Sequence, residues 1–329
     1  MLVLMMANTT SAQTCLLKNN DREWIEHTLT LWQTVSRDSL SLKSAPLPWI
    51  VLFDETCVWH VNPDLPISTP QKAVDFAKTK LSFARKFVDV YGIAHEGNIT
   101  LPDKRQISPQ LMTFVSSYNG GKKNFLVSAM PSIWQKAPHL KTEVNLNVLV
   151  RSVFVHEMTH ANHRNFFDAL NRIEKQYAFS EGFDDDIVQN HFSKSEDFSK
   201  SYETERDLLY QALSETDIQR KRQLAKNAFD IMQARRQKFF VGNGTIYTQV
   251  ENIFLTMEGA ANWAAYRAAK AEGLSETDAL KLICRDGKQW SQDEGLALFL
   301  LADSLLPAWQ NKVFGKSAVS IIDLLQKAL

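Results

Sequence analysis

Three residues whose types suit metal chemistry stand close together in the chain: His156, Glu157 and His160. Histidines four positions apart on a helix project from the same face, one turn above the other, so both can bind one metal ion at about 2 Å. Glu157 then lies beside that ion without binding it, where it can take a proton from water and pass it to a leaving amine. The spacing therefore predicts a metal-dependent hydrolytic site with Glu157 as general base.

A helix from 144 to about 168 is expected to carry these residues. The segment before His156 is apolar and uncharged, as a buried active-site helix requires, and no Pro or Gly interrupts the turn between the two histidines. The alternative is an ordinary helix whose histidines are solvated or hydrogen-bonded.

The segment Val155–His160 resembles the zinc-binding helix of the zincin superfamily of metallopeptidases. This resemblance implies a zinc ion (Zn2+) as cofactor and a peptide or protein as substrate. The metzincin branch would need Gly at position 163 and His at position 166, and this chain has His163 and Phe166 instead. A gluzincin-like arrangement remains, in which a distant helical glutamate is the third ligand.

Glu258 is the first candidate for that ligand, because Gly259, Ala260 and Ala261 follow it in the Glu-Gly-x-Ala pattern that the resemblance implies. Glycine inside a helix costs about 1 kcal/mol relative to alanine, so Gly259 indicates a packing requirement, expected here to be close approach to the metal-binding helix. Asn262, one turn further on, is positioned to hydrogen-bond a metal ligand. Gluzincins often carry Asp there.

Two other glutamates compete for this role. Glu251 lies two turns before Glu258 on the same face and is the second candidate. Glu294 is followed by Gly295 and Ala297, but its position near a helix start, with Ser291 as the expected cap, favours capping.

Supporting positions are less strongly indicated. Tyr247, and after it Tyr266, can donate to the oxyanion of a tetrahedral intermediate, although a packed position in the core is favoured for either tyrosine. His163 is expected beside a ligand, in contact with substrate, or at the surface. The apolar run 125–130 predicts a strand whose edge could bind substrate backbone by strand addition.

The pattern of the whole chain predicts an α+β fold that is predominantly α. A small mixed α/β part is expected over 14–143, followed by an all-helical zincin-like part over 144–329. A helical insertion at about 178–240 in the second part either covers the cleft or only adds bulk. The expected elements are a strand at 49–53 and helices at 21–37, 71–91, 203–214, 217–240, 246–270, 277–286, 291–305 and 317–328.

Composition limits the partners. Lys+Arg and Asp+Glu are equal at 37 each, which argues against nucleic acid and anionic membranes as partners. The basic residues around Arg235 and Arg236 are expected to form a solvated helix face.

No apolar run is long enough to span a bilayer, so no stable membrane insertion is expected. Residues 1–13 resemble a clipped export signal or a disordered tail. Oligomeric state is left open.

The three cysteines, Cys15, Cys57 and Cys284, form no CxxC pair and are too few for a disulfide scaffold, so a buried thiol is expected at each. The acidic run 184–186 is expected to be solvated or to cap a helix, which leaves no acidic cluster for the amine that an aminopeptidase must bind.

The sequence therefore favours a zinc-dependent peptidase. The first alternative is a zincin-fold protein that binds metal as a binding or regulatory module without cleaving peptides. The second is a helical interaction protein without metal.

Overall fold

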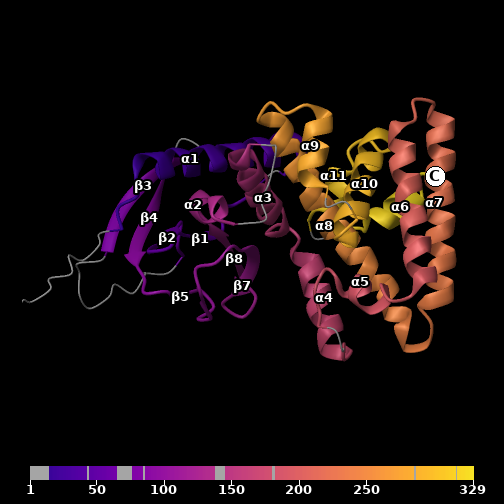
Figure 1. Ribbon diagram of the computed structural model, residues 1–329, viewed down its shortest axis with the longest axis horizontal. Coiled ribbons are helices and arrows are strands. Elements are labelled where there is room, and N and C mark those ends of the chain that lie inside the picture. Colours follow the sequence, from indigo (N-terminus) through magenta and orange to yellow (C-terminus); the bar gives the residue numbers. More distant parts are fainter. Residues whose placement is uncertain are drawn as a thin grey trace, which may run out of the picture. The chain divides into compact units, whose positions relative to one another are not determined.

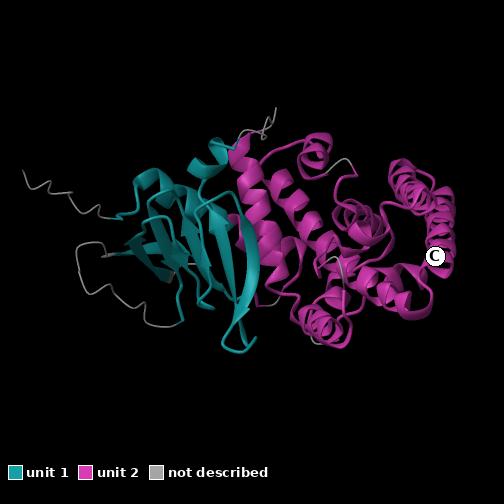
Figure 2. Cartoon of the chain, turned by 60° about the horizontal axis from the view of Figure 1, so that its bottom comes forward, with its two compact units in different colours: residues 1–30, 46–141 teal, residues 31–45, 142–329 magenta. Residues whose placement is uncertain are grey.

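The structure is a computed structural model, and it describes residues 15–42, 44–64, 76–83, 86–137, 145–179, 182–284, 287–315 and 317–329. The chain forms two compact units, coloured separately in Figure 2. Unit 1 comprises residues 1–30 and 46–141, and unit 2 comprises residues 31–45 and 142–329. The division expected near residue 143 assigned 31–45 to the first part, whereas these residues cluster with the helical unit. The segment 1–13, interpreted as a signal or tail, lies outside the described residues.

Unit 1 is built on a mixed sheet with the order β3-β4-β2-β1-β8-β7, in which β1 and β8 are parallel and the other pairs antiparallel (Figure 1). All five residues of β1 are buried, as the continuous apolar run 49–53 predicts. The fold is α+β and predominantly α, as expected. Besides the sheet, unit 1 holds α2 and the two-stranded pair β5–β6, and most of α1. The bounds are β1 Trp49–Phe53, β2 Cys57–Val61, β3 Phe76–Phe83, β4 Lys86–Ala94, β5 Ile99–Thr100, β6 Gln106–Ile107, β7 Thr113–Tyr118, β8 Lys123–Ala129, α1 Asn19–Thr34 and α2 Pro131–Gln135.

The helix predicted over 71–91 is wrong in its described part, which forms the antiparallel strands β3 and β4. Along β3, Ala77 and Leu81 are buried while Lys78 and Lys80 between them are exposed, so the burial period is 2. The apolar residues that fit a helical face fit this alternation as well, and pairing with β4 decides between the two. Residues 71–75 and 84–85 of that prediction lie outside the described part.

The strand predicted at 125–130 is present as β8, but its expected role as an edge is wrong. It pairs with β1 on one side and β7 on the other, so its backbone groups are already used within the sheet. Among the described strands, β3 and β7 form the edges of the sheet.

Cys15 and Cys57 form a disulfide, so the free thiol expected at each of them is wrong. The bond ties the segment before α1 to β2, and the indole nitrogen of Trp59 donates to the carbonyl oxygen of Cys15 at 3.3 Å. Cys284 is half-buried, and its sulfur lies 3.6 Å from the hydroxyl oxygen of Tyr210.

Unit 2 consists of helices, and the structure divides the predicted helix 144–168 into two. Asn145 caps α3 by accepting from the backbone amide of Asn147, and the chain turns at 161–163 before α4 begins.

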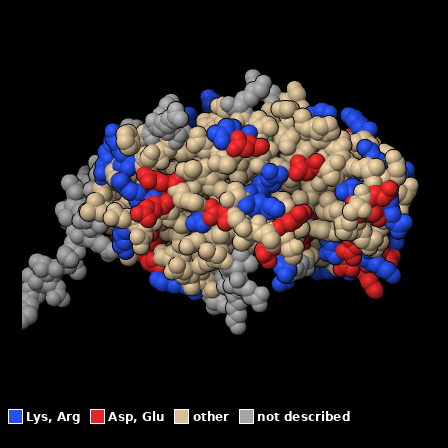
Figure 3. Space-filling view, turned by 90° about the horizontal axis from the view of Figure 1, so that it is seen from above, with Lys and Arg blue, Asp and Glu red and all other residues tan. Residues whose placement is uncertain are grey.

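The described chain contains no helix long and apolar enough to cross a membrane. Basic and acidic side chains are interspersed on the face shown in Figure 3. The helices are α3 Leu146–His160, α4 Arg164–Gln176, α5 Ile187–Phe192, α6 Glu196–Ser214, α7 Ile218–Phe239, α8 Ile246–Ala271, α9 Glu276–Ile283, α10 Trp290–Leu305, α11 Gln310–Val313 and α12 Ile321–Gln326, with short π and 3-10 turns η1 Val35–Ser39 and η3 Gly242–Thr245.

Helix α8 is the core of unit 2, packed on α3 on one side and α10 on another. It meets α10 where Gly259 faces Gly295: a β-carbon on Gly259 would lie 2.5 Å from the carbonyl oxygen of Gly295, and one on Gly295 would lie 2.7 Å from the α-carbon of Gly259. No side chain fits at that contact, so both positions require glycine. The packing requirement at Gly259 is therefore real, but its partner is α10 and not α3, the helix that carries His156 and His160.

Replacing Gly259 by alanine should force α8 and α10 apart, because backbone atoms of Gly295 and the ring of Phe299 occupy the space of the new methyl group. We expect the free energy of unfolding to fall by about 1–3 kcal/mol, measured by urea denaturation. Gly244→Ala is the matched control, since a β-carbon there meets nothing closer than 3.8 Å. Equal stability of the two variants would contradict this account of the contact.

Candidate metal centre

Two helices of unit 2 bring His156, His160 and Glu258 together in the interior. Helix α3 presents the two histidines one turn apart, and α8 presents Glu258 opposite them. The Nε2 atoms of the histidines are 3.0 Å apart, and they lie 3.3 Å (His156) and 3.2 Å (His160) from the two carboxylate oxygens of Glu258. All three residues are buried.

These spacings suit one metal ion. Four tetrahedral ligands at about 2.0–2.1 Å from an ion lie roughly 3.3 Å from one another. One ligand atom from each of His156, His160 and Glu258 lies within 4.8 Å of the other two, a group that could hold a metal ion.

The tautomer of His156 is set by Asn262. The amide nitrogen of Asn262 donates to the carbonyl oxygen of Gln292 at 3.2 Å, so its amide oxygen faces Nδ1 of His156 at 2.8 Å. That oxygen can only accept, and Nδ1 of His156 therefore carries the proton. The lone pair of Nε2 is left to point at Glu258 and His160, as metal ligation requires.

Glu258 is a buried carboxylate held in its charged form. Burial acts to raise its pKa, but the charges and hydrogen bonds of His160 and His156 outweigh this and hold the pKa well below the usual range. The same carboxylate raises the pKa of His160 against the lowering effect of burial. The site thus concentrates negative charge where a cation would lie.

Glu251, the second candidate for the third ligand, is occupied elsewhere. Arg235 donates to one of its oxygens at 2.9 Å and Arg236 to the other at 2.6 Å. Arg235 also donates to the carboxylate of Glu205 at 3.1 Å. The expectation that these arginines form a solvated face is wrong, because Arg235 is only 2% exposed and Arg236 7%.

Glu294, the third candidate, is neither a ligand nor a cap. Helix α10 begins at Trp290, so Glu294 lies inside the helix and Ser291 is not its N-cap. The side chain of Glu294 is fully buried, and neither of its oxygens has a hydrogen-bond partner among the described residues. Burial, together with the charge of Glu205, raises the pKa of Glu294 well above its usual value.

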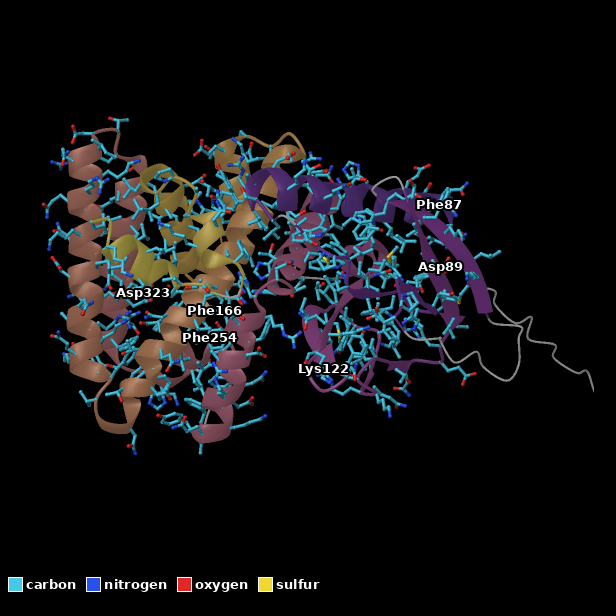
Figure 4. All side chains as sticks on the ribbon, turned by 180° about the vertical axis from the view of Figure 1, so that it is seen from behind. Phe87, Asp89, Lys122, Phe166, Phe254 and Asp323 are labelled. Atoms are coloured by element: carbon cyan, nitrogen blue, oxygen red, sulfur yellow. A yellow bond between two sulfur atoms is a disulfide. The ribbon has the colours of Figure 1, made fainter. Side chains whose placement is uncertain are left out.

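The structure does not bring the predicted oxyanion donors to the triad. Tyr247 precedes Glu258 by eleven residues on α8, about 16 Å along the helix axis, and Tyr266 follows it by eight, about 12 Å. Tyr247 packs in an aromatic cluster in which its ring stacks on His191. Phe166 and Phe254, both labelled in Figure 4, belong to the same cluster.

Glu157 and His163 lie on either side of the second ligand in sequence. Glu157 follows His156 directly on α3. Its side chain is half-buried, and the residue interacts with other groups of the protein. His163 is buried at the start of α4, its ring stacked on Phe314 with centroids 4.9 Å apart and 5.9 Å from the ring of His160. Burial lowers the pKa of His163 well below its usual value, so this ring is neutral. A surface position for His163 is thereby excluded.

Asp185 is a residue that the sequence analysis did not recognise as part of the site. Burial and the nearby charge of Glu258 raise its pKa to about 7, and the side chain of Gln292 donates to it. Gln292 also accepts from Asn262 through its carbonyl oxygen, so Asp185 is linked through Gln292 and Asn262 to His156. The solvated position predicted for the run 184–186 does not hold for Asp185. The acidic run 184–186 is evident in the sequence, but its spacing does not indicate which of the three side chains is directed toward Glu258.

No family model, curated protein or solved structure matches this chain.

Removing the amide of Asn262 should weaken metal binding without removing a ligand, because Nδ1 of His156 loses the acceptor that fixes its tautomer. We expect Asn262→Ala to lower the affinity for divalent zinc by roughly 10–100-fold, measured by competition with a chromophoric chelator. Asn252→Ala, on the same helix, is the control. Unchanged affinity in Asn262→Ala would show that this hydrogen bond does not support the site.

Proposed function

We propose that the protein is a zinc-dependent peptidase in which His156, His160 and Glu258 hold the metal and Glu157 is the general base. The observation that carries this proposal is the convergence of two imidazole nitrogens and one carboxylate within 3.3 Å of one another inside a buried site. Zinc is the metal that this ligand set favours, since two histidines and a glutamate are a common ligand set of catalytic zinc. The likeness of the His-Glu-Met-Thr-His segment to zincins supports the same proposal.

A zinc ion bound there would supply Lewis acidity, which activates water and polarises a substrate carbonyl. The protein supplies the rest. Glu157 follows a ligand on the same helix, where its carboxylate can accept a proton from water and return it to the leaving amine. Asn262 keeps His156 in the tautomer that leaves Nε2 free to bind, and burial excludes competing water from the ligands.

We also propose that the protein acts in an oxidising compartment, outside the cytoplasm. The Cys15–Cys57 disulfide supports this, because such bonds persist in exported proteins and are rare in reducing cytosol.

The alternative is a metal-binding module without proteolysis. It would use the same three ligands and would differ only in that Glu157 does not act as a general base. We expect Glu157→Gln to lower peptide hydrolysis by about 100-fold or more while one zinc per chain is retained. Hydrolysis is measured by mass spectrometry on a mixture of defined peptides, and zinc by elemental analysis of the same samples.

Glu174→Gln makes the same chemical change at an exposed position of α4 and should leave both measurements unchanged. Full activity in Glu157→Gln would contradict the assigned base. Absence of cleavage by the unsubstituted, zinc-loaded protein would favour the binding module.

A further inference from the structure

A small cavity lies between the α5 segment, α6, α8 and α10, near the candidate metal site. Its volume is about 20 Å³, enough for one group the size of a water molecule. Leu255 in its wall precedes Glu258 by three residues on α8, and Asp185 in its lining lies near enough to Glu258 for the two carboxylates to repel. The cavity therefore lies along α8 within two turns of Glu258.

The polar groups around the cavity divide into those satisfied by the protein and those that are not. Tyr202 donates to the carbonyl oxygen of Trp290 at 2.7 Å, and the arginines hold Glu251. Within the described chain, the carboxyl oxygens of Glu294 and the hydroxyl of Ser291 have no partner, although both residues are over nine-tenths buried. Burying such groups unpaired costs about 1–3 kcal/mol each, which favours a ligand that bonds to them.

The acids around the cavity outnumber the bases, so a cation bound there would allow the unmatched acids to ionise. Arg235 and Arg236 are matched by Glu205 and Glu251, two positive side chains against two negative ones. Glu294 and Asp185 are additional acids, and no ion pair is found for either among the described residues.

The geometry favours an ammonium group over a metal ion. In the part of the chain that the structure describes, His156, His160 and Glu258 are the one cluster of three potential ligands close enough to share an ion. An ammonium group is similar in size to water and has three N–H donors, which match the acceptors offered by Glu294, Ser291 and Asp185.

We propose that this cavity is a substrate subsite that binds a primary ammonium group, either the free α-amine of a peptide or the side chain of a lysine. The subsite rests on the proposed peptidase function, since the ammonium group would belong to a peptide bound with its cleaved bond at the metal, and the cavity lies within two turns of Glu258 on α8. An α-amine would make the protein an aminopeptidase, and a lysine would make it selective for a basic side chain.

Binding can be tested without hydrolysis in the full-length, zinc-loaded Glu157→Gln protein. Calorimetry would compare two peptide pairs: one peptide with a free or an acetylated amino terminus, and acetylated peptides with lysine or norleucine at each position in turn. We expect the ammonium-bearing member of one pair to bind at least about 10-fold more tightly, and that pair identifies the source of the ammonium.

Two further variants add Asp185→Asn or Glu294→Gln to Glu157→Gln. In each, the affinity ratio of the ammonium-bearing peptide to the neutral peptide should fall to about 3-fold or less, while the neutral peptide binds as before. Asp184→Asn, an exposed acid one residue away, should preserve it. If Glu294→Gln does not fold, the half-buried Asp185 still provides the test.

Equal binding of both members in every pair, including no measurable binding, would overturn the proposal, as would a preference that survives in Asp185→Asn. Either result would leave a cavity that holds only water. Cleavage by the unsubstituted protein is scored separately, so failure of the peptidase function is distinguishable from failure of the subsite.

Discussion

The site in unit 2 depends on one interaction: the buried carboxylate of Glu258 faces the Nε2 atoms of His156 and His160. Glu258 is charged, the His156 tautomer leaves a lone pair on Nε2, and the two Nε2 atoms are 3.0 Å apart. Such an arrangement is repulsive unless a proton or a metal ion lies between the groups. A metal ion would satisfy all three residues at once, and its binding would offset the cost of burying these polar atoms.

Several features of the helical unit fix the position of Glu258. The contact of Gly259 with Gly295 sets how closely α8 approaches α10, and the adjacent residue on α8 is Glu258, the proposed ligand. Two turns earlier, Glu251 is fixed by Arg235 and Arg236 of α7. The helical hairpin of α6 and α7, side by side in Figure 1, therefore contributes charged residues to the core and does more than add bulk. Ordered positions on both sides of Glu258 limit how far this ligand can move.

The sequence predicted those parts of the fold and site that depend on local spacing. A four-residue spacing on a helix suffices to place His156 beside His160, and a glycine after Glu258 suffices to indicate a close helix contact. The expected helix at 71–91 failed because apolar residues there fit two periodicities, and tertiary pairing decided between them. Burial of Arg235, the inward turn of Asp185 and the bond between Cys15 and Cys57 depend on segments far apart in the chain, which spacing does not relate.

The central claim is that one zinc ion is held by His156, His160 and Glu258. Elemental analysis of the purified protein after reconstitution and dialysis tests it most directly, with His160→Ala and the exposed His191→Ala as a matched pair. The account predicts one zinc per chain in the unsubstituted protein and in His191→Ala, and loss of zinc in His160→Ala. An unsubstituted protein that retains no zinc, or a His160→Ala protein that retains all of it, would contradict the account.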